Sequence, residues 1–144
     1  NWKKALEHVE DTGMKVLVEN TAGGKNSVAR YMDSIERLWE VIGHLNVGLC
    51  LDTCHTWAGG IPTIDAVKGF KKLVKKIDLI HFNDSKDGFE SSRDRHENLG
   101  KGKIPKEELE YVIKNAKTDI IVETPNGPDA QKKDIAWIRR RLKK

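Results

Sequence analysis

The sequence predicts an α/β fold in which a parallel sheet is covered by helices, and two observations support this. Four short runs, at residues 15–19, 47–52, 78–83 and 120–123, are almost continuously hydrophobic, as strands buried on both faces are. Stretches with helical periodicity alternate with them, and this repeat requires right-handed crossovers between parallel strands. Two closures remain open on this pattern alone. One is a doubly wound sheet, and the other is a (β/α)₈ barrel, which needs eight such units and about 250 residues.

Helical stretches with one apolar face lie between and around these runs. Their apolar side chains recur at steps of three and four, which is typical of helices packed on a sheet. The stretch before the second strand is expected to start at a cap formed by Asn26 or Ser27. Residues 84–103 show neither period, and irregular loops of about 20 residues are usually functional. The predicted helices cover residues 1–11, 28–42, 63–76, 105–116 and 129–144.

Length and composition bound the kind of protein. The chain has 144 residues and no linker-like segment, so residues 1–144 are expected to form a single unit. A formal net charge of +4 is compatible with a polyanionic partner but does not identify one. The sequence contains no apolar run of the roughly 18–20 residues that a membrane span needs, and its first residues lack the apolar core of a signal peptide. We therefore expect a cytoplasmic protein, and the start at Asn1 within a helical stretch suggests part of a longer one.

Every predicted strand ends in a side chain that can bind a metal ion. Because the carboxyl ends of parallel strands meet at one face, these side chains are expected to converge there. The long loop adds an acid and a histidine two positions apart, which share one side of the chain if this segment is extended. The seven candidate metal ligands are Glu19, Asp52, His55, His81, Asp94, His96 and Glu123.

Such a cluster favours a divalent metal. Four carboxylates crowded together without cations would raise one another's pKa values, at about 1.4 kcal/mol for each unit. Imidazole combined with carboxylate suits Zn²⁺ best, with Mn²⁺ or Fe²⁺ next. Carboxylates that bridge metals about 3.5–4 Å apart are the basis of two-metal phosphoesterases, so hydrolysis of a phosphodiester is one chemistry that the cluster would suit.

Simpler interpretations stand beside this for single residues. A lone carboxylate at a strand end more often caps a helix or forms a salt bridge. His81 lies in an apolar strand, where a hydrogen-bonded core histidine is the commoner case, and neither His8 nor His44 has an acidic partner in the pattern. Cys50 and Cys54 are too close together to staple a fold, and we interpret them as small core residues.

The long loop also carries basic residues that could contact phosphate groups. They share the loop with the acid and the histidine named above, whereas the other basic runs lie on outer helices. These candidates for phosphate contacts are Lys86, Arg93, Arg95, Lys101 and Lys103.

Five blocks of the sequence carry a resemblance to a known family. They read VENTAG, GLCLDTCH, HFNDSK, DRHENLGKG and VETP, and begin at residues 18, 48, 81, 94 and 122. In this order and spacing they resemble endonuclease IV, the second family of apurinic/apyrimidinic (AP) endonucleases. The likeness extends from about residue 5 to the end and covers the C-terminal half of the family's barrel.

The resemblance implies a TIM barrel of which this chain holds about four of the eight (β/α) units. It also implies a site for up to three Zn²⁺ ions, with Mn²⁺ as an alternative, and hydrolysis of double-stranded DNA on the 5′ side of an abasic site. In these terms Glu19 bridges two metals, while Asp52, His81 and Glu123 complete the second of that pair. His55, Asp94 and His96 then hold the third metal. Glu123 would also orient the attacking water, so Glu19 and Glu123 are the catalytic candidates.

The sequence departs from the family in what it lacks. Two further histidine ligands and the N-terminal DNA-binding loops of the family have no counterpart here, so the isolated chain is expected to have weak activity or none. A half barrel also leaves two strand edges open, and we expect it to pair with the missing half or with a second copy. Two alternatives remain: a sugar isomerase or epimerase of the xylose isomerase-like barrels, and a catalytically dead metal-binding half domain. The isomerases usually lack the Asp-Arg-His loop, which favours the nuclease.

Overall fold

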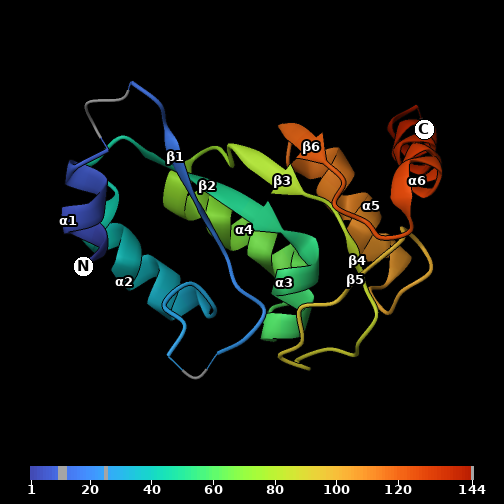
Figure 1. The fold of residues 1–144 in the computed structure, drawn as a ribbon, viewed down its shortest axis with the longest axis horizontal. Coiled ribbons are helices and arrows are strands. Elements are labelled where there is room, and N and C mark those ends of the chain that lie inside the picture. The colour runs from blue at the N-terminus through green and yellow to red at the C-terminus, as the bar shows by residue number, and fades with distance from the viewer. Residues whose placement is uncertain (10–12, 25, 144) are drawn as a thin grey trace.

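The centre of the fold is a four-stranded parallel sheet with β1 and β6 at its two edges (Figure 1). The computed structural model describes residues 1–9, 13–24 and 26–143. All three strand pairings are parallel, which confirms the predicted α/β fold class. In the order in which they lie side by side, the strands are β1 (Val16–Glu19), β2 (Val47–Asp52), β3 (Leu79–His81) and β6 (Asp119–Ile121).

Helices cover one face of this sheet (Figure 1). The long ones are α2 (Met32–Ile42), α4 (Thr63–Val74), α5 (Lys106–Asn115) and α6 (Gly127–Leu142), and α1 (Trp2–Glu7) packs on α2. Each long helix contacts the next, so they form one layer from β1 to beyond β6. None of the helices in the described part of the chain is long and apolar enough to cross a membrane.

The main core lies between the sheet and this helix layer. Leu49, Leu51 and Ile80 are buried there together with Phe70 of α4 and Leu109 of α5. Burying an aliphatic or aromatic side chain of this size contributes roughly 1.5–3 kcal/mol, so this layer accounts for much of the fold's stability. This packing fixes strands β2 and β3, and with them the positions of Asp52 and His81 at their carboxyl ends.

The opposite face of the sheet carries the polar strand ends. Side chains alternate between the two faces along a strand, and residues paired across parallel strands share a face. The register pairs Glu19 with Cys50, and Asp52 with His81, which in turn pairs with Ile121. Glu123, two residues beyond Ile121, belongs to the same face. The backbone therefore directs all four strand-end candidates to the side that the helices leave free.

One helix was not predicted. Helix α3 (Thr53–Gly59) follows β2 directly, at residues for which the sequence pattern predicts no helix. The helix forms because the Asp52 carboxylate caps it, accepting a hydrogen bond from the His55 backbone N–H at 2.8 Å. It ends at Gly60, whose φ of 93° lies in the left-handed region.

Other boundaries also differ from the prediction. Helix α2 starts four residues later, because Ser34 Oγ accepts from the Tyr31 backbone N–H, while Ser27 bonds to the Thr21 hydroxyl instead of capping a helix. Helix α6 starts after Asn126, not near Asp129. The predicted first helix ends at Glu7, and residues 10–12 lie outside the described part of the chain.

The loop at residues 84–103 is not wholly irregular. Two short strands, β4 (Asp84–Ser85) and β5 (His96–Glu97), pair in an antiparallel ladder. The Asp84 carboxylate strengthens this fold of the loop, since it accepts from the backbone N–H groups of Gly100, Gly102 and Ile104 at 3.0–3.1 Å. A side chain at Gly102 would collide with Asp84, so the sequence needs a glycine there. This hairpin returns His96 to the end of the sheet.

Candidate metal centre

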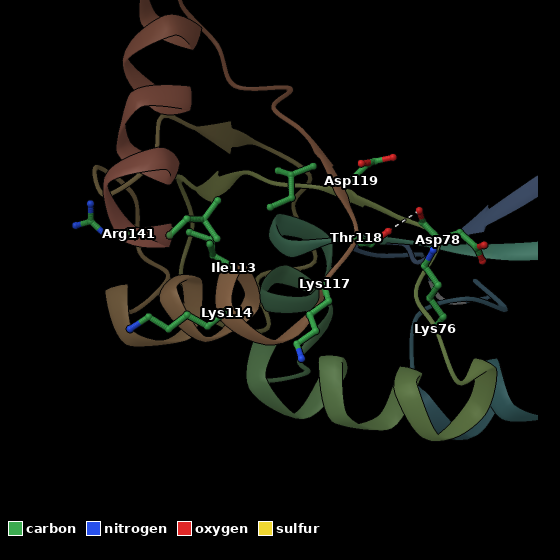
Figure 2. A pocket seen from close by; sticks show the side chains of 10 residues that line it. Lys76, Asp78, Ile113, Lys114, Lys117, Thr118, Asp119 and Arg141 are labelled. Atoms are coloured by element: carbon green, nitrogen blue, oxygen red, sulfur yellow. Dashed lines mark hydrogen bonds between the residues drawn. The ribbon is translucent and has the colours of Figure 1, made fainter. Parts of the chain in front are cut away.

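A large hollow of the surface lies far from the strand ends that carry the candidate ligands. A cavity of about 770 Å³ opens at the amino ends of β3 and β6, bordered by Lys76, Lys114 and Lys117 (Figure 2). The Thr118 hydroxyl donates to the Asp78 carbonyl at 2.8 Å across its floor. Asp78 precedes β3 and Thr118 precedes β6, whereas His81 and Glu123 lie at the other ends of these strands. The cavity is therefore not the candidate site.

At the carboxyl end of the sheet, Glu19 of β1 contacts one histidine on helix α3 and one at the end of β3. Its Oε1 lies 3.2 Å from His81 Nδ1 and 3.2 Å from His55 Nδ1. Glu123 Oε2 lies 3.2 Å from the same nitrogen, His81 Nδ1. One oxygen of Glu19 thus contacts a ring nitrogen of each histidine.

The loop at residues 84–103 brings a second acid and histidine to α3. His55 Nε2 lies 3.0 Å from Asp94 Oδ2, and His96 Nε2 lies 3.2 Å from Asp94 Oδ1. The Asp52 Oδ2 atom is 3.6 Å from His96 Nε2, so the strand-end and loop groups are continuous. All seven residues named from the sequence thus meet in one cluster.

Within this cluster the donor atoms form groups of metal-binding size. One atom each from His55, Asp94 and His96 lie within 4.8 Å of one another, and the same is true of Asp52, His81 and Glu123. We call these groups the loop subsite and the strand subsite. A third group joins Glu19, Asp52 and His55, which links the two subsites.

Backbone carbonyls fix the two histidines of the loop subsite. His55 Nδ1 lies 2.8 Å from the Asn20 carbonyl oxygen, and His96 Nδ1 lies 3.2 Å from that of Glu123. An Nδ1–H that donates to its carbonyl leaves Nε2 as the nitrogen directed into the cluster. Metal-binding histidines almost always have an outer hydrogen bond of this kind.

Three buried imidazole nitrogens support the fit to a metal. In the described part of the chain, His55 Nε2, His81 Nδ1 and His96 Nε2 make no well-aligned hydrogen bond, although carboxylate oxygens lie close to each. Buried polar atoms are normally paired, and an unpaired one costs roughly 1–3 kcal/mol. Nitrogen and oxygen donors without a required thiolate are the ligands of Zn²⁺, so the residues present fit this ion.

Two buried asparagines hold Asp52 in place. The side chain of Asn20 accepts from the Asp52 backbone N–H at 2.8 Å and donates to the Asp52 carbonyl at 3.1 Å. Asn83 donates from Nδ2 to Asp52 Oδ2 at 2.8 Å and accepts from the Glu123 backbone N–H at 2.9 Å. Sequence reasoning missed both residues, although each directly follows or closely follows a candidate ligand in the quoted blocks. Their amides thus hold the backbone and the carboxylate of Asp52 and the backbone of Glu123, two of the candidate ligands.

The charges in the cluster shift its pKa values in opposite directions. Burial opposes the charge of His55, but its hydrogen bond to Glu19 and the nearby charges of Asp52 and Asp94 outweigh this and raise the pKa of His55 to about 10. Burial also opposes the charge of Glu19, yet His55 and His81 lower the pKa of that carboxyl. Burial raises the pKa of Asp52 against the pull of His55 and His96. Without metal, the cluster therefore retains protons that a metal would displace.

The two cysteines lie closer to this cluster than the sequence suggested. Cys50 falls in a group with Glu19 and His81, and Cys54 in one with Asp52 and His96. Burial raises the pKa of each thiol to about 12, so both are neutral near pH 7. The interpretation as small core residues agrees with their burial.

The basic loop residues are arranged unequally. Lys86, Lys101 and Lys103 are exposed, whereas both arginines face an acid of the same loop. Arg95 Nε donates to Asp87 Oδ2 at 2.7 Å, and Arg93 Nη1 lies 3.7 Å from Asp87 Oδ1. The hydrogen bond from Arg95 holds the pKa of Asp87 below its usual value. Lys101 and Lys103 lie in the segment whose backbone N–H groups donate to the Asp84 carboxylate. Their backbone positions are therefore fixed.

Comparison with known proteins identifies the family. The model of the AP endonuclease 2 family, described as a xylose isomerase-like TIM barrel, matches residues 1–141. The chain belongs to this family. The predicted fold is thereby confirmed as part of a TIM barrel, with four parallel strands and their helices present.

Relatives of known name agree with this assignment. The chain is 49% identical over 140 residues to a probable endonuclease 4 of Mycobacterium tuberculosis. The alignment covers 97% of this chain and 54% of that protein. The crystal structure of endonuclease IV from Thermus thermophilus is similar with a TM-score of 0.80 and 30% identity, over 98% of this chain and 56% of that one. A D-tagatose 3-epimerase-like protein has a TM-score of 0.70 at 22% identity, which shows the fold alone. The chain spans about half the length of the curated relatives it matches.

Proposed function

We propose that this chain is the metal-binding half of a zinc-dependent endonuclease that hydrolyses the DNA phosphodiester 5′ of an abasic site. The observation that carries the proposal is the single cluster of four carboxylates and three histidines, in which three buried imidazole nitrogens lack aligned partners. Relatives named as endonuclease IV support the same reaction. The cluster contains the loop subsite in addition to the strand subsite, and a metal site formed by strand-end residues alone would lack it.

The proposed chemistry divides between the metal and the chain's own groups. Bound zinc would supply Lewis acidity that activates water and stabilises negative charge on the phosphate. Glu19 would hold two ions at a fixed separation, since one of its oxygens already lies between two imidazoles. Glu123, half-exposed at the open side of the cluster, would orient the attacking water. The exposed Lys86, Lys101 and Lys103 would contact the DNA backbone.

Two alternatives are separated by particular residues. A sugar isomerase or epimerase shares the fold, as the likeness to a D-tagatose 3-epimerase-like protein illustrates, and would use the strand subsite. It has no evident use for His55, Asp94 and His96 as a further subsite, which favours the nuclease. A catalytically dead metal-binding half domain would keep every ligand, so only an activity assay separates it.

Nicking of a defined duplex tests the proposed reaction. We expect the 144-residue chain alone to nick a duplex carrying one abasic site weakly or not at all. Fused to the part of the Mycobacterium tuberculosis relative that it does not cover, it should cut 5′ of the abasic site, leave an extendable 3′-hydroxyl and lose activity with a chelator. Glu123→Gln in this fusion should lower the rate by at least roughly 100-fold, whereas Glu40→Gln on the exposed side of α2 should leave it unchanged.

Two results would count against this account. A folded, metal-loaded fusion that leaves the abasic duplex intact would reject the nuclease and return attention to sugar substrates. Robust chelator-sensitive nicking by the chain alone would contradict the expectation that half a barrel is inactive.

The open sheet edges bear on the partners of the chain. Ile121 on β6 is 48% exposed, and Ile135 and Leu142 on α6 are exposed beside it. Apolar side chains therefore lie next to the edge of β6 that faces away from β3. We propose that these edges are covered by the rest of the family barrel. For the chain alone a second copy offers the same edges, so sedimentation should show a dimer or larger species. A monodisperse monomer of 16.3 kDa would contradict this. The cytoplasmic location remains a prediction from the sequence.

A further inference from the structure

A buried carboxylate on α6 ties together the two segments that carry candidate ligands from different subsites. Asp134 is 4% exposed. Its Oδ2 accepts from the Thr124 hydroxyl at 2.6 Å and from Asn98 Nδ2 at 2.7 Å, while its Oδ1 accepts from the Leu99 backbone N–H at 3.0 Å. Thr124 directly follows Glu123 of the strand subsite. Asn98 and Leu99 follow His96 of the loop subsite by two and three residues.

Further hydrogen bonds make these contacts into one network. Asn98 Nδ2 also donates to the Pro125 carbonyl at 3.1 Å, and Asn98 Oδ1 accepts from Asn126 Nδ2 at 2.7 Å. The His96 imidazole itself reaches the Glu123 carbonyl. The segment after β5 and the segment after β6 are thus joined side to side, and Asp134 anchors both to the same helix.

The chemistry of the anchor matters as well as its position. In the described part of the chain Asp134 forms no ion pair, so three neutral donors alone compensate the burial of its carboxylate. Burying a charge without a cation is costly. An amide would be cheaper to bury, but one of its two terminal atoms is a donor, and the three groups facing Asp134 are arranged to donate. Only a side chain with acceptors at both Oδ1 and Oδ2 satisfies the donors of Asn98 and Leu99 together with that of Thr124.

We propose that Asp134 is a positioning residue that sets the spacing between the loop subsite and the strand subsite. This inference rests on the metal centre of the proposed function. Through Thr124 the carboxylate fixes the backbone that carries Glu123, and through Asn98 and Leu99 it fixes the backbone that carries His96. Asp52 lies between the two subsites, in one donor group with His81 and Glu123 and 3.6 Å from His96 Nε2. This spacing is kept only if the two segments stay in place, and outer hydrogen bonds of this kind tune metal sites.

Cobalt binding tests the proposal, because Co²⁺ replaces zinc and its visible absorption reports ligand geometry. Titration of the Asp134→Asn chain should show Co²⁺ affinity lowered by roughly 10–100-fold and an altered absorption spectrum. Asp129→Asn is the matched control: it lies on the same helix, changes charge equally and has a side chain that is 90% exposed. It should bind Co²⁺ as the unchanged chain does. Measurements are made where circular dichroism shows each variant folded.

A milder variant keeps the test decisive if Asp134→Asn does not fold. Thr124→Val preserves shape but removes one donor to Asp134, and it should shift the Co²⁺ spectrum with a smaller loss of affinity. Unchanged spectra and affinities in the folded variants would overturn the positioning role, even if their melting temperatures fall, while leaving the proposed function intact. If the unchanged chain itself bound no Co²⁺, the metal centre would fail and this proposal with it.

Discussion

Replacing His55 by alanine is expected to remove about one bound zinc ion from each chain. His55 takes part in two groups of donor atoms, one with Asp94 and His96 and one with Glu19 and Asp52. Its Nε2 has no aligned hydrogen bond in the described part of the chain, so the alanine variant loses a ligand without breaking a hydrogen bond at that atom. Loss of an outer partner typically costs roughly 10–100-fold in metal affinity, and loss of a direct ligand should cost more.

Metal analysis after dialysis measures this effect directly. His96→Ala should behave in the same way, because His96 supplies the other imidazole of the loop subsite. His44→Ala is the control, since His44 is exposed beyond α2 and lies outside the cluster. It should retain the full zinc content. Equal zinc in all four proteins would reject the assignment of the loop subsite.

Zinc binding near pH 8 is expected to release about one proton from His55. The surrounding carboxylates hold its pKa near 10 in the metal-free chain, so the imidazole carries a proton at this pH. A metal needs the lone pair on Nε2 and must displace that proton. Through this group alone, zinc affinity should therefore increase by about tenfold for each unit by which the pH is raised, until the pH reaches 10. Above pH 10 the proton release should disappear.

The same shift fixes the sign of the pH dependence without metal. A pKa raised from 6.5 in the unfolded chain to about 10 in the folded one means that folding favours protonated His55. The resulting stabilisation is complete below pH 6.5 and is lost as the pH rises through 10. Zinc titration by calorimetry in two buffers of different ionisation enthalpy measures the released protons. Heats that do not depend on the buffer at pH 8 would contradict the assigned protonation, and His55→Ala should release about one proton fewer.

The fold was predictable where burial leaves a strong pattern. Strand β2 has the predicted bounds, because every residue from Gly48 to Asp52 is buried and the hydrophobic run is unbroken. Strand β6 lies one residue earlier than predicted at its start and ends sooner, since as an edge strand it has exposed residues at both ends. Helix α3 could not be anticipated from periodicity, because seven residues give too little pattern. Its cap is Asp52, so the simpler interpretation of a strand-end carboxylate, a helix cap, also holds for this residue.

The candidate site was predictable to the level of its charged residues. The carboxyl ends of parallel strands lie at the same edge of the sheet, so the strand-end residues Glu19, Asp52 and His81 could be placed together from the sequence alone. The supporting residues could not be found in this way. Asp134 looks like one more acid on a basic, exposed helix, and its burial depends on two distant loops folding over it. Asn83 likewise gains its role only when β2 and β6 are brought to either side of it.

The central claim is that these seven side chains converge because they bind metal. Crystals of the chain grown with zinc, with diffraction data collected on both sides of the zinc absorption edge, test it most directly. The account predicts an anomalous peak about 2.0–2.1 Å from both His55 Nε2 and His96 Nε2, with Asp94 as a further ligand. Zinc found only at surface residues elsewhere, with the seven side chains paired to one another, would contradict it.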